Sequence, residues 1–419
     1  MKKLIAVIGA NYGDEGKGLM TDYFAAQNMD LLDNKVLVVR YNGGAQAGHT
    51  VQLDKSDSPE SIGGDWNTGR HIFNHFGSGT FANAPTYLGP KFVVNPILFN
   101  RELKALGMKM APKVYVSLDS PVTTPYDMLL NQWLEQSRGN DRHGSCGVGI
   151  HETIHRNPVA MLEVSTLFNL DTLRSTLAYI REFYIPNRLE ELNIPQTADI
   201  MHTLRSEEFA GRFMDECKQF RNMVIPTELA VLNEYETIIF EGAQGLLLDQ
   251  DFGTFPYVTH SNTGLKNIIE LLKVSSCDFG TDSILNICYV TRWYLTRHGN
   301  GPFPHEIINL PHPKVIEKTN ITNEWQGLFR YGLLDVNDLN ARIKFDIHKY
   351  LPSYIPYKLE LAVTCLDQSD GRGSFYYDGN FRDQPLTGLI ETLDGTIVPD
   401  KMYLSYGPTR NDIKEKEIE

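Results

Sequence analysis

Short apolar runs alternate with longer mixed segments along this chain. Most of the runs are continuous in Val, Ile, Leu and Tyr instead of alternating with polar residues. Such runs are typical of strands buried on both faces, as in the parallel sheet of an α/β fold. The clearest are Leu4–Ile8, Val36–Tyr41, Val114–Leu118, Thr237–Phe240, Asn286–Leu295 and Leu359–Leu366. The pattern therefore predicts a mostly parallel central sheet covered by helices.

Helical periodicity and loop composition complete this outline. Apolar residues recur at helical spacing in Ile97–Leu106, Ser165–Phe183 and Ala210–Met223. Stretches rich in Gly, Ser, Asp or Arg predict loops at Asp54–Asp65, Ser137–Gly149 and Asp370–Phe381. None resembles a domain linker, and we find no internal repeat. We therefore expect one large α/β domain over residues 1–419, with helical and loop insertions.

Composition narrows the class of protein. The chain has 419 residues, 42% of them apolar, and a formal net charge of -13. That charge argues against a nucleic-acid partner, which needs a basic face. The five cysteines show no Cys-x-x-Cys spacing, which favours reduced thiols in a cytoplasmic protein. No run approaches the ~20 apolar residues of a membrane span, so no membrane association is expected.

The segment after the first predicted strand has the chemistry of a phosphate-binding loop. Gly9–Gly18 reads Gly-Ala-Asn-Tyr-Gly-Asp-Glu-Gly-Lys-Gly, and a helix is predicted to follow it. Glycines let backbone N–H groups approach phosphate oxygens, and the helix N-terminus favours an anion. The usual Ser or Thr after Lys17 is absent, so Asp14 becomes the first candidate to hold magnesium. The alternative is a plain glycine-rich turn with solvated acids.

Four segments resemble the adenylosuccinate synthetase family in the order that family has them. Gly13–Gly18 is similar to its N-terminal signature, and Phe240–Thr259 contains Phe-Glu-Gly-Ala-Gln-Gly and Gly-Thr-Phe-Pro-Tyr-Val-Thr. The other two are Gly43–Thr50 and Thr296–Pro304. The resemblance implies a P-loop NTPase-like fold and a ligase that uses GTP to join L-aspartate to C6 of a 6-oxopurine nucleotide, through a 6-phosphoryl intermediate and with Mg²⁺.

The resemblance also implies roles for individual residues. Asp14 would be the general base at purine N1, His49 would act on the departing β–γ bridging oxygen, and Gln244 would donate to O6. Asp14 and the Gly48 carbonyl would hold Mg²⁺. Asp367 would accept from N1–H and N2–H of guanine, which favours GTP over ATP. The GTP-binding residues implied are Gly13, Glu15, Gly16, Lys17, Gly18, Asp367, Gly407 and Pro408.

The acceptor and aspartate sites depart from the family pattern. The acceptor nucleotide would meet Gln46, Ser145, Cys146 and Thr259, and Arg156 would reach a neighbour's acceptor phosphate across a homodimer interface. The family's aspartate-binding arginine loop retains only Arg330, so Arg297 and Thr322 are further candidates. These changes leave IMP and dGMP as near-even acceptors. The dGMP alternative is the specificity of a viral branch of the family, which would place the protein in a host cytoplasm.

Two other classes remain open from the residues alone. A GTP-binding regulatory module would explain Lys17 and Asp367 but not Gln244 or His49. Another phosphate-loop kinase or ligase would not need the Gln244 turn.

Overall fold

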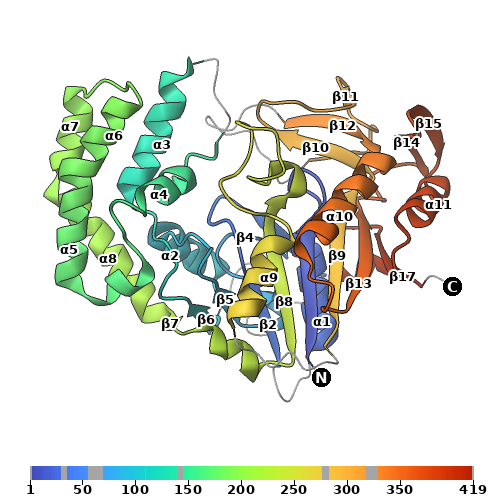
Figure 1. Cartoon of the computed structure of the whole chain (residues 1–419), viewed down its shortest axis with the longest axis horizontal. Coiled ribbons are helices and arrows are strands. Elements are labelled where there is room, and N and C mark those ends of the chain that lie inside the picture. Colours follow the sequence, from blue (N-terminus) through green and yellow to red (C-terminus); the bar gives the residue numbers. More distant parts are fainter. Residues whose placement is uncertain are drawn as a thin grey trace.

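The computed structural model describes residues 2–29, 35–54, 69–108, 110–139, 145–275, 283–317 and 329–417. Within these ranges ten strands form one central sheet (Figure 1), in which every neighbouring pair is parallel except β16 and β17. In spatial order the strands are β17 (Ile413–Glu417), β16 (Lys401–Ser405), β13 (Tyr357–Thr364), β9 (Leu285–Arg292), β1 (Lys3–Gly9), β8 (Thr237–Gly245), β2 (Val36–Arg40), β5 (Thr86–Leu88), β6 (Val114–Val116) and β7 (Ile225–Pro226). The predicted fold class is confirmed.

The continuous apolar runs follow from burial of both faces of this sheet. In β1, Leu4, Ala6 and Ile8 belong to the core under the helices of one face, whereas Ile5 and Val7 pack in a separate core on the other. The first face is covered by α9 (Leu265–Val274), α10 (Val336–Tyr350) and α11 (Leu386–Ile397), and the second by α1 (Lys17–Asn28). Successive side chains of a strand point to opposite faces, so a strand covered on both sides must be apolar at every position.

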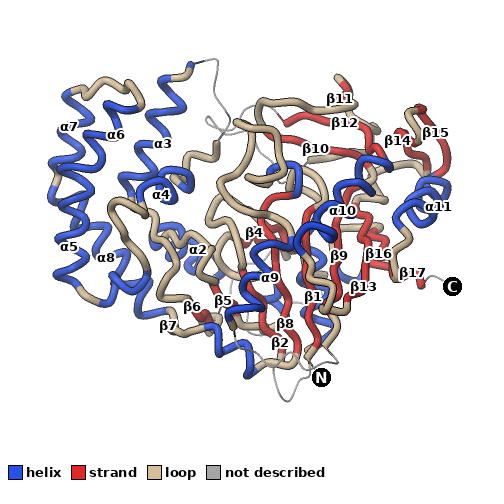
Figure 2. Tube along the Cα trace, viewed as in Figure 1, coloured by secondary structure: helices blue, strands red, loops and turns tan. Residues whose placement is uncertain are grey.

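A helical layer extends from the β5–β7 edge of the sheet and has its own apolar core (Figures 1 and 2). Its N-terminal caps are made by side chains that the sequence supplies. Thr124 and Asp127 form a reciprocal capping box at α3, and Asn95 caps α2. The helices are α2 (Pro96–Leu106), α3 (Pro125–Ser137), α4 (Ile150–Arg156), α5 (Leu170–Tyr179), α6 (Ile185–Glu191), α7 (Ala198–Arg205) and α8 (Glu207–Met223).

A second sheet lies next to the part of the central sheet that contains β9, β13 and β16 (Figure 2). It pairs β10 (Tyr294–His298), β12 (Phe329–Asp335), β14 (Arg372–Tyr377) and β15 (Asn380–Pro385), with β11 (Glu306–Ile307) beside β12. A third, two-stranded sheet pairs β3 (His49–Gln52) with β4 (Arg70–Phe73). The single predicted strand over residues 286–295 is thus divided at Trp293 between two sheets.

The prediction of a loop at residues 370–381 was wrong, because this stretch forms most of the β14–β15 hairpin. The register pairs Tyr377 with Asn380, which leaves a two-residue turn of Asp378 and Gly379, both with positive φ. Asp-Gly is a strong hairpin signal for that backbone geometry. The predicted loops at 54–65 and 137–149 lie partly outside the described residues. No helix of the described ranges is both long and apolar enough for a membrane crossing.

Candidate active site

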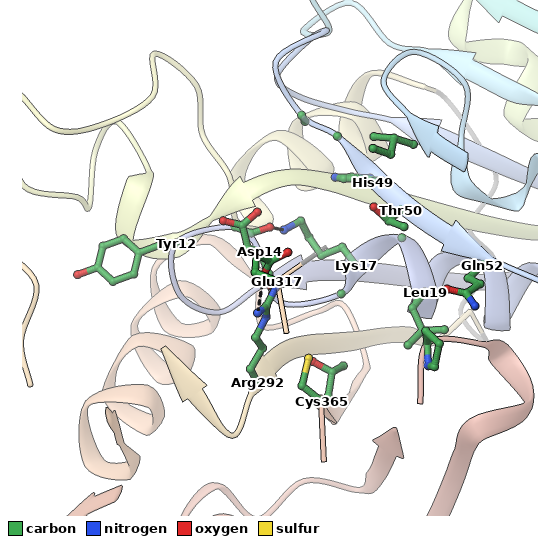
Figure 3. Close-up of a pocket in the computed structure, with 18 of the residues that line it drawn as sticks. Tyr12, Asp14, Lys17, Leu19, His49, Thr50, Gln52, Arg292, Glu317 and Cys365 are labelled. Carbon is green, nitrogen blue, oxygen red and sulfur yellow. Dashed lines mark hydrogen bonds and ion pairs between the residues drawn. The ribbon is translucent and has the colours of Figure 1, made fainter. Parts of the chain in front are cut away.

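A cavity of about 670 Å³ opens where the carboxyl ends of β1, β8, β9 and β13 meet the start of α1 (Figure 3). Side chains and turns far apart in the sequence converge there, as expected for ligand sites at this edge of a parallel sheet. The predicted site residues that line it are Gly13, Asp14, Gly16, Lys17, Gly18, Gln46, Gly48, His49, Cys146, Gln244, Asp367, Gly407 and Pro408. These residues are therefore positioned to contact a common set of ligands.

The phosphate-loop segment has an open helix N-terminus. Gly16 caps α1 with φ 101° and offers no side chain to its N–H groups. Gly13 has φ 114°, and a Cβ there would lie 3.0 Å from the Gln244 Cα. Glycine tolerates both the positive φ and the close approach. The N–H groups of the first helical turn and the Lys17 side chain thus face the cavity without a competing cap.

The Glu15 side chain lies beneath the loop and does not line the cavity, so its contact with GTP stays a prediction. Its carboxylate accepts the backbone N–H groups of Asn11 and Gly13, at 3.0 and 2.7 Å, and lies 3.2 Å from the Lys17 ammonium. Glu15 therefore shapes the loop from the protein side. A carboxylate that satisfies these donors holds the loop closed even when no phosphate is present.

Asp14 extends into the cavity beside Arg292 (Figure 3), and the His298 imidazole also lies near its carboxylate. His298 Nε2 lies 3.7 Å from Asp14 Oδ2, and Arg292 Nε donates to the Asp14 carbonyl oxygen at 2.5 Å. Arg292 also pairs with Glu317 at 3.2 Å. Burial raises the pKa of the Asp14 carboxyl above its ordinary value, although His298 and Arg292 oppose the shift. A carboxylate with a raised proton affinity is suited to accept a proton from a ligand.

His49 belongs to a buried network at the opposite wall. Its Nδ1 lies 2.5 Å from Glu241 Oε1, and Ser78 donates to the same carboxylate through both its hydroxyl and its N–H. Arg40 lies 3.7 Å from Glu241 Oε2. Burial would raise the pKa of Glu241, but Arg40 and His49 outweigh it and hold that pKa at about 2. The ionised carboxylate therefore accepts from Nδ1, which leaves Nε2 of His49 without a partner among the described residues.

Two turns with unusual backbone conformations complete the cavity. Gln244 lies one residue before the end of β8 and Cys365 directly follows β13, with φ of 64° and 60°, values that are uncommon for residues other than glycine. The Cys365 carbonyl accepts from the Trp293 indole N–H at 2.9 Å, which holds its turn in place. Such conformations persist where the surrounding structure imposes them, and they are frequent at ligand sites. The second turn leads directly to Asp367.

The residues predicted for the acceptor nucleotide are only partly brought together. Gln46 and Cys146 line the cavity, and both amide atoms of Gln46 are buried without a partner in the described structure. Ser145 accepts from Asn131 at 2.9 Å, and the Thr259 N–H donates to the Leu248 carbonyl. Neither Ser145 nor Thr259 lines the cavity.

Arg156 is fully buried, so the prediction that it reaches across a dimer interface was wrong. Its Nε donates to Asp127 at 2.9 Å, and its other nitrogens donate to the Ala160 and Val122 carbonyls. A buried guanidinium needs such complete pairing because desolvation of an unpaired charge is unfavourable. Arg156 therefore stabilises the end of α4 and is not available to a ligand.

The predicted aspartate-binding arginines contact other protein groups, and their role in binding aspartate stays a prediction. Arg330 pairs with both oxygens of Glu306 and donates to the Gly299 and Gly301 carbonyls, so its donors are engaged within the second sheet. Arg297 donates to the Pro302 carbonyl and packs over the Tyr12 ring at 4.7 Å. Neither arginine lines the cavity. Thr322 lies outside the described residues.

Several cavity and network residues were missed by sequence reasoning. Arg40 ends a strand and Glu241 lies inside the Phe-Glu-Gly-Ala-Gln-Gly segment, so neither stands out in the sequence as a functional residue. Arg292 and His298 lie at strand ends beside motifs that drew attention to other residues. A charged side chain that ends an otherwise apolar buried strand was the available signal for Arg40 and Arg292.

The donor set fits a hard cation without forming a complete cage. The Asp14 carboxylate and Gly48 both border the cavity. Among the described residues no group of three or more His, Cys, Asp or Glu is arranged to hold a metal. Mg²⁺ in phosphate-transfer sites is usually held by one or two carboxylates together with substrate phosphates. The residues present therefore fit Mg²⁺ bound together with a nucleotide.

A parallel sheet with a phosphate-binding loop at its carboxyl edge, facing a histidine held by a buried carboxylate, defines a nucleotide-dependent enzyme of the P-loop class. The adenylosuccinate synthetase family model matches residues 6–339, and the chain belongs to that family. It is 32% identical over 326 residues to the adenylosuccinate synthetase of Clostridium botulinum (strain Alaska E43 / Type E3), covering 74% of this chain and 68% of that protein. Identity to the Legionella pneumophila (strain Philadelphia 1) enzyme is 30% over 328 residues, covering 76% and 68% of the two chains.

Solved structures agree on the fold. A fully ligated adenylosuccinate synthetase from Plasmodium falciparum superposes with a TM-score of 0.71 at 18% identity, covering 99% of this chain and 100% of that one. The cyanophage S-2L succinoaminodeoxyadenylate synthetase, solved with dGMP and dATP, gives a TM-score of 0.59 at 15% identity, covering 99% and 95%. The chain is therefore a GTP-dependent ligase of aspartate and a purine nucleotide, of the adenylosuccinate synthetase type.

Proposed function

We propose that this chain transfers the γ-phosphoryl group of GTP to O6 of a 6-oxopurine nucleoside monophosphate. The amine of L-aspartate then attacks C6 and phosphate leaves, which forms the C–N bond. The observation that carries this proposal is the convergence of Asp14, Lys17, His49 and Gln244 on one cavity. A switch or regulatory module would need the phosphate loop but not this opposed set of acid, histidine and amide.

Asp14 and Gln244 act on the purine edge. The O6 carbonyl is a weak nucleophile until the N1 proton is removed, and Asp14 accepts that proton. The Gln244 amide donates to O6 as negative charge develops there. The close backbone approach of Gly13 to Gln244 supports these two roles, because it places Gln244 beside the loop that carries Asp14.

His49 acts on the phosphate donor. Burial lowers the pKa of His49 to about 4, with Arg40 adding to the effect and Glu241 opposing it. The free enzyme therefore holds a neutral imidazole at the border of the cavity. Negative charge on a bound triphosphate favours the imidazolium form, and Glu241 balances its charge. In that form Nε2 stabilises the β–γ bridging oxygen as it departs.

The remaining cavity residues bind and orient GTP. Lys17 and the α1 N-terminus bind phosphate oxygens, and Asp367 accepts from the N1–H and N2–H of guanine. Gly407 and Pro408 border the same end of the cavity. Asp14 and the Gly48 carbonyl would hold Mg²⁺, which supplies positive charge to the β- and γ-phosphate oxygens when bound.

The acceptor is IMP or dGMP in this proposal, and Gln46 and Cys146 are its candidate contacts in the cavity. Arg330, Arg297 and Thr322 remain the candidate contacts for L-aspartate. We retain the homodimer and the cytoplasmic setting as part of the proposal, the host cytoplasm if the source is viral.

The test is an assay of phosphate release from GTP, with and without acceptor nucleotide and L-aspartate. We expect release that depends on both, and a product whose mass equals acceptor plus aspartate minus water. Asp14→Ala and His49→Ala should each lower turnover by roughly 10²–10⁴-fold, while GTP binding measured by calorimetry largely survives. Phosphate release that ignores the acceptor and aspartate would contradict the ligase mechanism. Normal turnover in either variant would remove the role assigned to that residue.

A further inference from the structure

His298 occupies the cavity wall immediately beside the proposed catalytic carboxylate. It ends β10, and its register partner across the strand pair is Phe329, whose ring centroid lies 4.6 Å from the imidazole centroid. Phe329 fixes the position of the ring from one side. The side chain is 15% exposed and borders the cavity. None of the roles proposed above uses His298.

The contact between His298 and Asp14 leaves room for a ligand atom. Nε2 of His298 and Oδ2 of Asp14 are 3.7 Å apart, which is too long for a direct hydrogen bond. Two acceptor atoms at this separation can each accept from one of two neighbouring N–H donors on the edge of a bound base. Nδ1 of His298 is buried without a partner in the described structure. The ring is therefore not committed to protein hydrogen bonds that would prevent such a contact.

The purine edge has three consecutive positions, which are the O6 carbonyl, the N1–H and the substituent at C2. Gln244 serves the first and Asp14 the second in the proposed function, on which this inference rests. In this arrangement His298, which lies 3.7 Å from Asp14, would meet the third position. In a base with hydrogen at C2, the imidazole would face a C–H group and gain nothing. In a base with an exocyclic amine at C2, one N–H reaches Asp14 or His298 while the other remains free.

We propose that His298 is a specificity-determining residue that reads the 2-position of the acceptor, and that the acceptor is a 2-amino-6-oxopurine nucleoside monophosphate. The imidazole accepts a hydrogen bond from the exocyclic amine while Asp14 accepts from N1–H. A buried site built to pair with an amine discriminates against an analogue that lacks it, because its polar groups are then left unpaired. The same chemistry is presented by GMP and by dGMP.

The experiment compares four acceptors with the full-length protein, GTP and L-aspartate. IMP and dIMP lack the 2-amino group, and GMP and dGMP carry it, so the base and the sugar vary separately. We expect kcat/KM to be higher for GMP or dGMP than for the matching acceptor without the amine. His298→Val should reduce that ratio by about tenfold, the effect of one hydrogen bond, through KM and kcat of the 2-amino acceptors. His298→Asn, which keeps a hydrogen-bonding side chain, should restore part of the ratio.

A matched control lies in the same part of the fold. His305 stacks on Tyr376 at 3.8 Å and pairs with Asp335, away from the cavity lining. His305→Val should leave the ratio between acceptors unchanged. An equal loss on all four acceptors in His298→Val would show that His298 acts only by positioning Asp14, and would overturn the inference. So would a parent enzyme that uses IMP or dIMP alone.

Failure of the proposed function has a different signature. In that case no acceptor would yield an aspartate-dependent product in the parent protein, and both proposals would fall together. Because the parent enzyme alone ranks the four acceptors, the inference remains testable even if His298→Val does not fold.

Discussion

At the residue scale, the least expected feature is the buried charge network behind His49. Glu241, Arg40 and Ser78 surround one imidazole nitrogen with almost no solvent exposure. Buried ion pairs contribute little net stability compared with apolar packing, because desolvation offsets their attraction. Their value here lies in orientation: Glu241 holds Nδ1 of His49, and Nε2 is left without a partner among the described residues.

Removing the charge of Glu241 tests this interpretation. Glu241→Gln should lower kcat by about 10²-fold or more, with a smaller change in KM for GTP, because the amide no longer stabilises the imidazolium. Stability should fall by roughly 3–5 kcal/mol, since Arg40 would be buried without its counter-charge. Steady-state kinetics and thermal melting measure the two effects. Phe76→Leu, a core change nearby, controls for stability loss alone. An unchanged kcat in a folded Glu241→Gln protein would contradict the orienting role.

A second residue-scale prediction concerns the choice of phosphate donor. Asp367→Asn should weaken use of GTP by about tenfold or more relative to ATP, because an amide presents only one acceptor to the paired N1–H and N2–H of guanine. Phosphate release with each nucleotide at saturating acceptor and aspartate gives the ratio. Equal use of GTP and ATP by the parent protein would contradict the assignment of Asp367.

At the scale of elements, α10 carries a buried carboxylate into the core next to α9. Asp346 accepts from the Tyr289 hydroxyl and from the Leu265 N–H, at the N-terminus of α9. Burial raises the pKa of Asp346 to about 7, although both hydrogen bonds oppose the shift. The neutral carboxylic acid is therefore the form that the packed helices favour at acidic pH.

The sign of the resulting pH dependence follows from proton linkage. Between about pH 4 and pH 7 the native state keeps a proton on Asp346 that the unfolded chain has lost, so this residue's contribution to stability falls as pH rises. Asp346→Asn removes the titration, and its stability relative to the parent should increase from pH 5 to pH 8 by an amount on the order of 2–3 kcal/mol. Thermal melting at both pH values measures this difference. Asp338→Asn, an exposed change on the same helix, should show no such trend. A parallel response of parent and Asp346→Asn to pH would argue against the buried titration.

At the scale of the whole molecule, the candidate active site lies at the carboxyl edge of the central sheet, where segments from both halves of the chain meet. The chain leaves the central sheet at Trp293, and β10 places His298 beside the phosphate loop. The two solved structures share the fold of this chain, with TM-scores of 0.71 and 0.59. The single domain over residues 1–419 stays a prediction.

The homodimer also stays a prediction, and burial of Arg156 removes the residue that first suggested it. We expect light scattering after gel filtration to give a mass near twice that of the 47.5 kDa chain. Dilution should shift the protein toward monomer if the interface is weak. A mass equal to one chain at every concentration, with full activity, would exclude a dimer as a requirement for catalysis.

Local sequence determined which segments became buried strands, where α1 begins, and that the loop before it suits phosphate. Those properties depend on residues within one turn or strand, such as the glycines around Asp14 and the unbroken apolar run of β1. The Asp378-Gly379 turn of the β14–β15 hairpin could also have been predicted from local sequence. Tertiary structure alone decided that Arg156 and Arg330 pair with internal acids, that Glu241 holds His49, and that His298 stands beside Asp14. Each of these partners lies far away in sequence or across a strand pair, and whether a charge meets a counter-charge or a ligand depends on distances that only the folded chain sets.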